Sequence, residues 1–294
     1  MKNAVSRIIR QSVSIALFGL LLTVGCSNLI PTSLTALQAD SVRVVTADQL
    51  RYVPLNPARG DRSPQAGVLW GDIRKDEASG TLLRFADGFS SPPHIHNITY
   101  RAVVISGEIH NDDPEAAMLW MDPGSFWIQP AGEVHITAAK PGRGGTAFLE
   151  ILTGPYLVQP STEAFDDGER PLNLLRDNIV WMSAEEFRWL NGTGGAEGVQ
   201  AALLWGDLRS GAEKGLFLMM PADYRGMLRA VDHGIRSVVV KGGVEHQVAG
   251  VTELSSLMAG GFFESAAGVE HSLSCRSASP CLLYVRTQGA FEVR

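Results

Sequence analysis

The residues best suited to chemistry are histidines, and most of them lie in one part of the chain. Four of the seven histidines fall between residues 88 and 135, namely His94, His96, His110 and His135. Imidazole is the commonest metal ligand among protein side chains, so this cluster predicts a metal site. Residues two apart on a strand face the same side of it, so His94 and His96 would direct both imidazoles into one cavity.

The surrounding sequence predicts the elements that hold this cluster. Short apolar runs alternate with turn residues such as Gly, Pro, Asn and Asp, a pattern typical of an antiparallel sandwich or barrel and not of alternating strands and helices. The clearest runs in the first half are residues 80–85, 100–105, 117–121, 126–129 and 146–153. The sequence therefore predicts an all-β domain of the closed antiparallel type.

The chain also contains an internal repeat. The sequence Trp-Gly-Asp-Ile-Arg that begins at Trp70 returns as Trp-Gly-Asp-Leu-Arg from Trp205. Four such matches keep an offset of 135–137 residues, which indicates a protein made of two copies. We place the copies at residues 44–159 and 178–294, joined by a polar linker at 160–177.

Two local patterns predict short helices that flank the copies. Thr46 is followed three residues later by Gln49, and Ser183 by Glu186. This is the capping-box pattern, in which the two side chains satisfy backbone N–H groups at the start of a helix. Each copy is therefore expected to open with a short helix.

Several other residues have a structural interpretation that we prefer to a functional one. Glu108 and Glu150 are expected at the surface or at the end of a domain. Trp120 and Trp127 are expected in the core, with the wall of a pocket as the alternative. The repeated Trp-Gly-Asp sequence predicts a buried tryptophan next to an Asp–Arg pair that joins strand edges. We assign none of these residues to the site.

The spacing of the site residues resembles that of a known family. Two segments match the two cupin motifs at every spacing: Gly88, His94, His96, Tyr100 and Gly107 in the first, and Gly124, Pro130, Gly132 and His135 in the second. The chain resembles a bicupin, similar to an uncharacterised bacterial domain-of-unknown-function family and to the cupin domain of anti-sigma regulators. The resemblance implies two tandem double-stranded β-helix (jelly-roll) barrels, and a metal bound by residues 94, 96, 100 and 135.

The sequence departs from the cupin pattern at one ligand position, where Tyr100 stands in place of glutamate. His94, His96 and His135 still supply three neutral nitrogens, which suffice for a divalent transition metal such as Fe, Zn, Mn, Cu or Ni. Tyr100 faces the same side as His94 and His96. Its phenol is predicted either to ligate weakly or to hydrogen-bond to a metal-bound water or a substrate.

His110 is a further candidate beside the three predicted ligands. It continues the alternation of His94 and His96 beyond Gly107, so it would line the same cavity as a fourth ligand or a proton carrier. A bulge at Gly107 would turn it outward instead. In an enzyme, Tyr100 or His110 would move protons or orient the substrate.

The second copy has lost most of the motif. Arg229, Val231 and Ile235 stand where the first copy has two histidines and a tyrosine, and only His271 remains. We therefore predict a single metal site, in the N-terminal copy.

The N-terminal sequence predicts a targeting signal that is not part of the folded domains. Three basic residues precede an apolar run at 12–25, which is too short to span a bilayer but suits a secretory signal. The run ends in a sequence that resembles a bacterial lipobox with Cys26 as acceptor, although Thr23 stands where Leu is usual. We expect a signal peptide at 1–25, a tether at 26–43, and a lipid on Cys26 that anchors the chain to the periplasmic side of a membrane, in a Gram-negative cell the outer membrane. The alternative is a secreted or periplasmic protein that loses Cys26.

Charge and cysteine content limit the partners and the compartment. The chain has 25 Lys+Arg and 31 Asp+Glu, so loss of the three basic residues before the predicted cleavage leaves 22 against 31, a net charge of −9. This balance argues against nucleic acid, which requires clustered basic residues. Cys275 and Cys281 are predicted to form a disulfide in an oxidising compartment; two unpaired thiols are the alternative.

The sequence leaves several functions open. The first is a metal-dependent, dioxygenase-like oxidoreductase that acts on a small organic molecule, as the resemblance to cupins implies. The second is a non-catalytic lipoprotein that binds or senses a metal or a small ligand at the cell envelope. In a third, the metal only stabilises the barrel. The resemblance also allows a homodimer.

Overall fold

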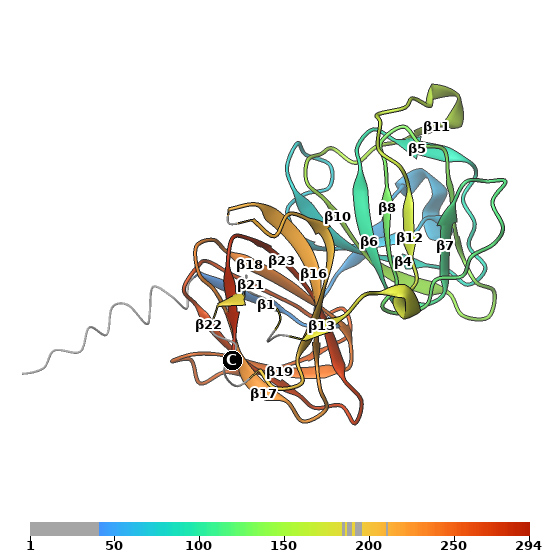
Figure 1. Ribbon diagram of the computed structural model, residues 1–294. Helices are drawn as coiled ribbons and strands as arrows, with labels where there is room; N and C mark the ends of the chain where they lie inside the picture. Colours follow the sequence, from blue (N-terminus) through green and yellow to red (C-terminus); the bar gives the residue numbers. More distant parts are fainter. Residues whose placement is uncertain (1–40, 184–185, 187–189, 192–195, 210) are drawn as a thin grey trace, which may run out of the picture.

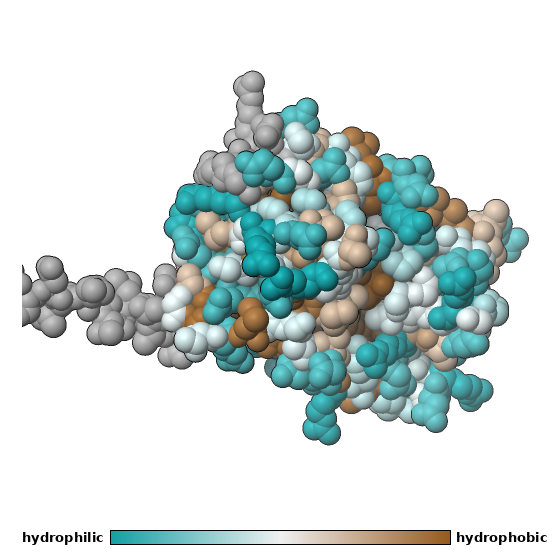
Figure 2. All heavy atoms as spheres, turned by 90° about the horizontal axis from the view of Figure 1, so that it is seen from below, coloured by the Kyte–Doolittle hydropathy of each residue, from teal (hydrophilic) through white to brown (hydrophobic). Residues whose placement is uncertain are grey.

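The structure is a computed structural model that describes residues 41–183, 186, 190–191, 196–209 and 211–294 (Figure 1). The predicted signal peptide, Cys26 and almost all of the predicted tether lie outside these residues. In the part of the chain that the structure describes, no helix combines the length and the apolar character needed to cross a membrane. Hydrophilic residues cover much of the face shown in Figure 2, with hydrophobic residues in smaller groups between them.

The N-terminal copy is built of antiparallel strands. Its main sheet has the order β12-β8-β6-β10-β4-β3-β2. The strands are β2 (Tyr52–Pro54), β3 (Gln65–Trp70), β4 (Ser79–Phe85), β6 (Tyr100–Gly107), β8 (Phe126–Gln129), β10 (Gly145–Ile151) and β12 (Leu172–Leu174). Two short pairs face this sheet: β5 (His94–His96) with β11 (Val158–Pro160), and β7 (Ile109–Asp112) with β9 (Ile136–Ala139). The described helices are short 3-10 turns: η1 (Pro57–Arg62), η2 (Ser161–Glu163) and η3 (Arg176–Asn178).

The C-terminal copy repeats this arrangement with longer strands. One sheet has the order β1-β21-β18-β23-β16-β15-β13 and the other β14-β24-β17-β22-β19-β20. The first contains β1 (Val42–Val45), β13 (Met182–Ser183), β15 (Gln200–Gly206), β16 (Glu213–Met220), β18 (Ile235–Lys241), β21 (Phe262–Ser265) and β23 (Cys281–Gln288). The second contains β14 (Leu190–Asn191), β17 (Arg225–Ala230), β19 (Gly243–Val248), β20 (Leu254–Met258), β22 (Glu270–Cys275) and β24 (Phe291–Val293). The predicted all-β fold with two jelly-roll copies is confirmed.

The two copies exchange strands. Strand β1, which precedes the first copy, pairs with β21 of the second copy, and in Figure 1 it lies in blue among the orange and red strands. Strand β12, from the predicted linker, pairs with β8 of the first copy. The segment before each copy therefore completes the sheet of the other copy.

Three apolar cores hold the molecule together. Each copy has its own interior core, and a third core fills the space between the two seven-stranded sheets. In this third core Trp70 of the first copy stacks on Phe262 of the second, with ring centroids 5.0 Å apart. Burial of so much apolar surface between the copies is the main force that fixes one against the other.

The repeated tryptophans and arginines meet at this contact in a nearly symmetric way. The Arg101 guanidinium lies 4.5 Å from the ring centroid of Trp205, and the Arg236 guanidinium lies 5.4 Å from that of Trp70. Each copy therefore places its arginine over the tryptophan of the other. The predicted burial of the repeated tryptophans is confirmed. Each Asp–Arg pair, however, lies within a single turn and does not join strand edges.

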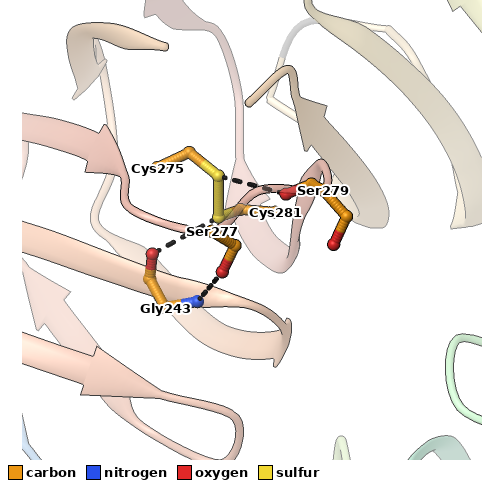
Figure 3. Close-up of a disulfide and its surroundings, with 5 residues drawn as sticks. All are labelled: Gly243, Cys275, Ser277, Ser279 and Cys281. Carbon is orange, nitrogen blue, oxygen red and sulfur yellow. Dashed lines mark hydrogen bonds between the residues drawn. A yellow bond between two sulfur atoms is a disulfide. The ribbon is translucent and has the colours of Figure 1, made fainter. Parts of the chain in front are cut away.

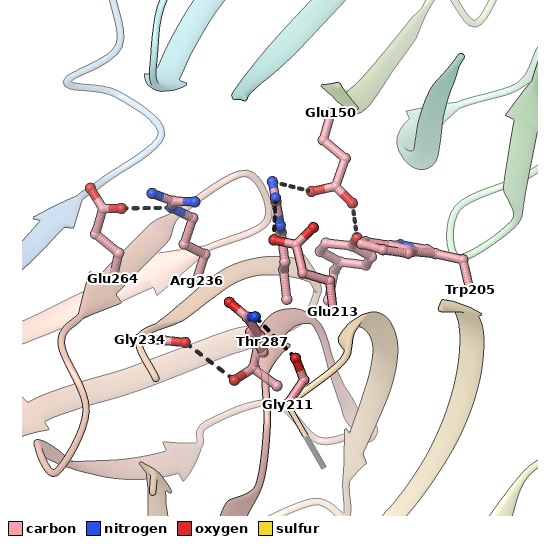
Figure 4. Close-up of polar contacts among 11 residues, drawn as sticks. Glu150, Trp205, Gly211, Glu213, Gly234, Arg236, Glu264 and Thr287 are labelled. Atoms are coloured by element: carbon pink, nitrogen blue, oxygen red, sulfur yellow. Dashed lines mark hydrogen bonds and ion pairs between the residues drawn. The ribbon is translucent and has the colours of Figure 1, made fainter. Parts of the chain in front are cut away.

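Glu150 was predicted at the surface or at the end of a domain, and this was wrong: its strand faces the other copy and its side chain is fully buried. Its Oε1 accepts a hydrogen bond from the Tyr284 hydroxyl, which accepts one from Trp205 Nε1 at 2.8 Å (Figure 4). Its Oε2 lies 3.7 Å from Arg286 Nη1. Burial raises the pKa of Glu150, and the guanidinium of Arg286 opposes that rise.

The first predicted capping box does not begin a helix. Gln49 Oε1 does accept from the Thr46 backbone N–H at 3.0 Å, as the pattern requires. The chain then makes only a turn, because β1 ends at Val45 and β2 begins at Tyr52. At the second box, Glu186 Oε2 accepts from Ser183 N–H at 3.1 Å, but most of that predicted helix lies outside the described residues.

The predicted disulfide is confirmed. Cys275 at the end of β22 and Cys281 at the start of β23 are bonded, and the bridge closes the turn between these strands (Figure 3). The Ser277 hydroxyl accepts a hydrogen bond from the Gly243 N–H at 2.8 Å, which ties the same turn to β19.

Candidate metal centre

Three of the predicted site histidines come together in the N-terminal copy. His94 and His96 lie on β5, and the backbones of His94 and His135 exchange hydrogen bonds of 3.1 and 3.0 Å. One ring nitrogen from each histidine lies within 4.8 Å of the others, and all three side chains are buried. Among the described residues this is the one group of three possible ligands.

Backbone carbonyls fix the orientation of all three imidazoles. His94 Nδ1 lies 2.9 Å from the Pro92 oxygen, His96 Nδ1 lies 2.8 Å from the Leu157 oxygen, and His135 Nδ1 lies 3.1 Å from the Glu133 oxygen. A carbonyl can only accept, so each Nδ1 carries the proton and each Nε2 presents a lone pair. Metal-ligating histidines are held in this way, with the second nitrogen bonded to a carbonyl or carboxylate.

The surroundings keep these imidazoles neutral. Burial lowers the pKa of His135 to about 3, with the nearby His94 as a smaller cause. Burial also lowers the pKa of His96 well below its ordinary value, and that of His94 to a lesser degree. Neutral nitrogens are the form that binds a metal. The residues present therefore fit a divalent transition metal, whose nitrogen ligands these would be.

The Tyr100 hydroxyl lies beside this cluster but donates its proton to Asn111 and not to a histidine. Its hydroxyl donates to Asn111 Oδ1 at 2.9 Å, and its oxygen lies 3.4 Å from His135 Nε2. Thr137 Oγ1 donates to the same Asn111 oxygen at 2.7 Å, and Asn111 Nδ2 donates to Gln129 Oε1 at 2.8 Å. Burial raises the pKa of Tyr100, so the phenol stays protonated. This network was not visible in the motif, because Asn111 and Gln129 stand outside it.

His110 does not join the cluster, so the prediction that it lines the same cavity as the three histidines was wrong. The pairing of β6 with β10 shifts register between Val104 and Ser106. This bulge turns Asn111 toward Tyr100 in place of His110. His110 is buried on the opposite side of the strand, where its Nδ1 accepts from the Leu119 N–H at 3.2 Å.

Tyr156 is a site residue that the sequence did not indicate. Its hydroxyl lies 3.1 Å from His96 Nε2 and donates to that lone pair. Its ring stacks on the imidazole of His96, with centroids 4.2 Å apart. Burial raises its pKa well above the ordinary value. It reaches the cluster because β11, just after it, pairs with β5, a contact that no local pattern signals.

A cavity of about 340 Å³ opens beside the histidines, a size typical of small-molecule sites. His94, His96, Tyr100 and Tyr156 line it. Most of the other walls are aromatic or aliphatic, including Phe85, Phe89, Trp127 and Leu149.

The C-terminal copy has a different arrangement at the same place. His271 Nε2 lies 2.8 Å from Ser265 Oγ, and its Nδ1 lies 2.8 Å from His246 Nε2. Arg229, at the position of the first motif histidine, pairs with Glu292 at 3.0 Å. The predicted loss of the second site agrees with these contacts.

Fold and site together define a protein of two cupin-fold copies, of which the N-terminal copy contains a buried three-histidine cluster. The chain belongs to the family described as Domain of unknown function (DUF4437), which matches residues 43–294 and so spans both copies. No curated protein matches the sequence.

Solved structures of cupin fold resemble the chain at low identity. A candidate dioxygenase from Nostoc punctiforme has a TM-score of 0.61 at 12% identity, over 85% of this chain and 83% of its own. Salicylate 1,2-dioxygenase from Pseudaminobacter salicylatoxidans has a TM-score of 0.53 at 14% identity, over 84% of each chain. Oxalate decarboxylase from Lactobacillus farciminis has a TM-score of 0.52 at 10% identity, over 85% of this chain and 87% of its own.

These likenesses establish the cupin fold, which confirms the resemblance drawn from the two motifs. The predicted similarity to the cupin domain of anti-sigma regulators stays a prediction.

Proposed function

We propose that the N-terminal copy binds one divalent transition metal through Nε2 of His94, His96 and His135, and that this centre serves dioxygenase-like oxidation of a small organic molecule. One observation carries the proposal: three buried imidazoles have their Nδ1 protons held by carbonyls, so three lone pairs face one another beside a cavity of about 340 Å³. The fold shared with two proteins named as dioxygenases supports the reaction class.

The chain's own residues have distinct parts in this proposal. The three histidines hold the metal, which when bound supplies Lewis-acid and redox chemistry. The apolar walls exclude water from the reacting atoms. Tyr100 keeps its proton on the bond to Asn111, so its oxygen can accept a hydrogen bond from a bound ligand. Tyr156 must give up its bond to His96 when the metal takes that lone pair, and its hydroxyl is then available to the ligand.

The test uses residues 27–294 purified without an affinity tag and stripped of metal. Titration with Fe²⁺, Zn²⁺, Mn²⁺, Cu²⁺ and Ni²⁺ should show about one tight site per chain. The variant His94→Ala should lose that site without unfolding. Oxygen consumption by the iron-loaded protein over a panel of small acids, diketones and thiols then tests the reaction. A chain that takes up no transition metal contradicts the proposal; tight metal binding without any turnover supports the non-catalytic binder instead.

We also propose that the protein is tethered at the cell envelope by a lipid on Cys26. The apolar run before Cys26 and the lipobox-like sequence support this location. Mass spectrometry of the mature N-terminus should find a lipidated Cys26. A chain with a free N-terminus beyond Cys26 would favour the secreted alternative.

A further inference from the structure

The walls of the cavity beside the histidines include one side chain with a permanent charge. Arg59 is the only Lys, Arg, Asp or Glu among the described residues that line it. The remaining walls are mainly aromatic and aliphatic. A ligand that matches this lining therefore has an apolar body and a negative charge at one end.

Hydrogen bonds support the backbone of the segment that carries Arg59. Arg59 lies on η1, whose first turn is capped by Asn56 Oδ1 accepting from the Ala58 N–H at 3.0 Å. The Asn56 N–H donates to Ser63 Oγ at 2.8 Å, so both ends of the turn are tied together. The exposed Arg59 side chain extends from this supported backbone and lines the cavity.

The Arg59 guanidinium is free to receive an anion. No described carboxylate forms an ion pair with it, whereas Arg74 pairs with Asp72 and Arg170 with Asp166. Arg59 and His94 both line the cavity, so the cation and the proposed metal site border the same space.

We infer that the cavity takes a small apolar monocarboxylate, whose carboxylate pairs with Arg59 while its hydrocarbon or aromatic body packs on the walls beside the metal. This inference rests on the proposed function, because it names the substrate class of the same site. A guanidinium matches a carboxylate with two parallel hydrogen bonds.

The test measures binding and does not depend on turnover. Calorimetry on the zinc-loaded chain compares three carboxylates (benzoate, phenylacetate and 4-methylpentanoate) with their neutral amides. At least one carboxylate should bind about tenfold or more tightly than its amide. Arg59→Gln should remove this preference. Arg62→Gln is the matched control: it lies exposed on the same η1 turn but does not line the cavity, so it should keep the preference.

Two outcomes overturn the inference. One is that no carboxylate binds more tightly than its amide. The other is that Arg59→Gln still binds the carboxylate more tightly, because the metal alone would then account for the preference. Failure of the proposed function is separate. If the chain takes up no zinc, the proposed metal centre fails, and an Arg59-dependent preference in the metal-free chain would still uphold the carboxylate site.

Discussion

His135 and His271 hold the same motif position in the two copies, but their ring nitrogens have different partners. His135 donates Nδ1–H to a backbone oxygen, which leaves the Nε2 lone pair available beside His94 and His96. His271 has both nitrogens in hydrogen bonds of 2.8 Å, one with Ser265 and one with His246. His135 therefore keeps a nitrogen lone pair that a metal can take, with its other nitrogen held by the backbone, whereas His271 has a protein partner at each nitrogen.

The hydrogen bonds around His271 leave this residue no free lone pair for a metal. The Ser265 hydroxyl donates to the Ala266 oxygen at 3.0 Å, so Ser265 Oγ accepts from His271 Nε2. His271 Nδ1 must then accept from His246 Nε2. Both nitrogens of His271 are thus engaged with protein groups.

The strand pairing identifies the residue that distinguishes the surroundings of the two motif histidines. Asn111 pairs with Thr137 and His246 pairs with Leu273, and residues 137 and 273 both lie two positions after the motif histidine. Asn111 and His246 are therefore equivalent. In the N-terminal copy the asparagine binds Tyr100 and leaves the motif histidine alone, whereas in the C-terminal copy the imidazole donates to that histidine.

The largest expected effect comes from removing the two motif histidines in turn. His135→Ala should lower zinc affinity by more than about 100-fold, because it removes a ligand. His271→Ala should leave zinc affinity unchanged and lower the free energy of unfolding by about 2 kcal/mol, because His246 and Ser265 lose a buried partner. Competition with a chromophoric chelator and urea unfolding measure the two quantities. Equal losses of zinc affinity in both variants would contradict the distinction between the copies.

The next effect concerns Glu150 and Arg286, which occupy equivalent places in the two copies. Glu150 pairs across strands with Arg101, and Arg286 with Arg236. Glu150→Ala should lower the free energy of unfolding by about 3 kcal/mol, because Arg286 loses a buried partner. The matched control is Glu213→Ala, which removes the half-exposed partner of Arg286 and should cost about 1 kcal/mol or less. Similar costs for both variants would show that the buried pair does not hold the copies together.

Acid should destabilise both copies through their buried histidines. Burial lowers the pKa of His135 and of His271 from 6.5 to about 3. Between pH 6.5 and pH 3 the unfolded chain therefore binds protons that the folded chain does not, and stability falls as the pH falls. At pH 5 each such histidine costs about 2 kcal/mol relative to pH 7.

Urea unfolding of the metal-free chain at pH 7 and pH 5 measures this loss. His271→Gln should reduce the difference between the two pH values by about 2 kcal/mol, whereas replacement of the exposed His233 should not. A difference that is the same with and without His271 would contradict the buried, neutral state of this residue.

The smallest expected effect tests the tyrosine that replaces the cupin glutamate. Tyr100→Phe should lower the free energy of unfolding by about 1 kcal/mol, because Asn111 loses one of two hydroxyl donors. Zinc affinity should change by less than about tenfold, because the hydroxyl lies beside the histidines and is not needed as a ligand. Complete loss of zinc binding by this variant would instead identify Tyr100 as a ligand.

Most of the fold and the core of the site could be predicted from the sequence. The repeat and the two motifs are local patterns, and they located His94, His96 and His135 because motif spacing and strand alternation decide which way these side chains point. The cysteine spacing likewise gave the disulfide.

The remaining site residues depend on contacts that local patterns do not encode. His110 was misplaced because a bulge interrupts the alternation, and the motif does not reveal where a bulge falls. Tyr156 arrives through the pairing of β11 with β5, between segments far apart in the chain. Glu150 was expected at the surface because the face that its strand presents to the other copy cannot be read from one copy alone.

The most direct test of a single N-terminal metal centre is elemental analysis of the protein purified without a tag from the cells that naturally make it. We expect about one equivalent of a transition metal per chain. We also expect that the metal is lost from His135→Ala and retained by His271→Ala. Less than about a tenth of an equivalent in the natural protein, or metal lost from His271→Ala as well, would contradict this account.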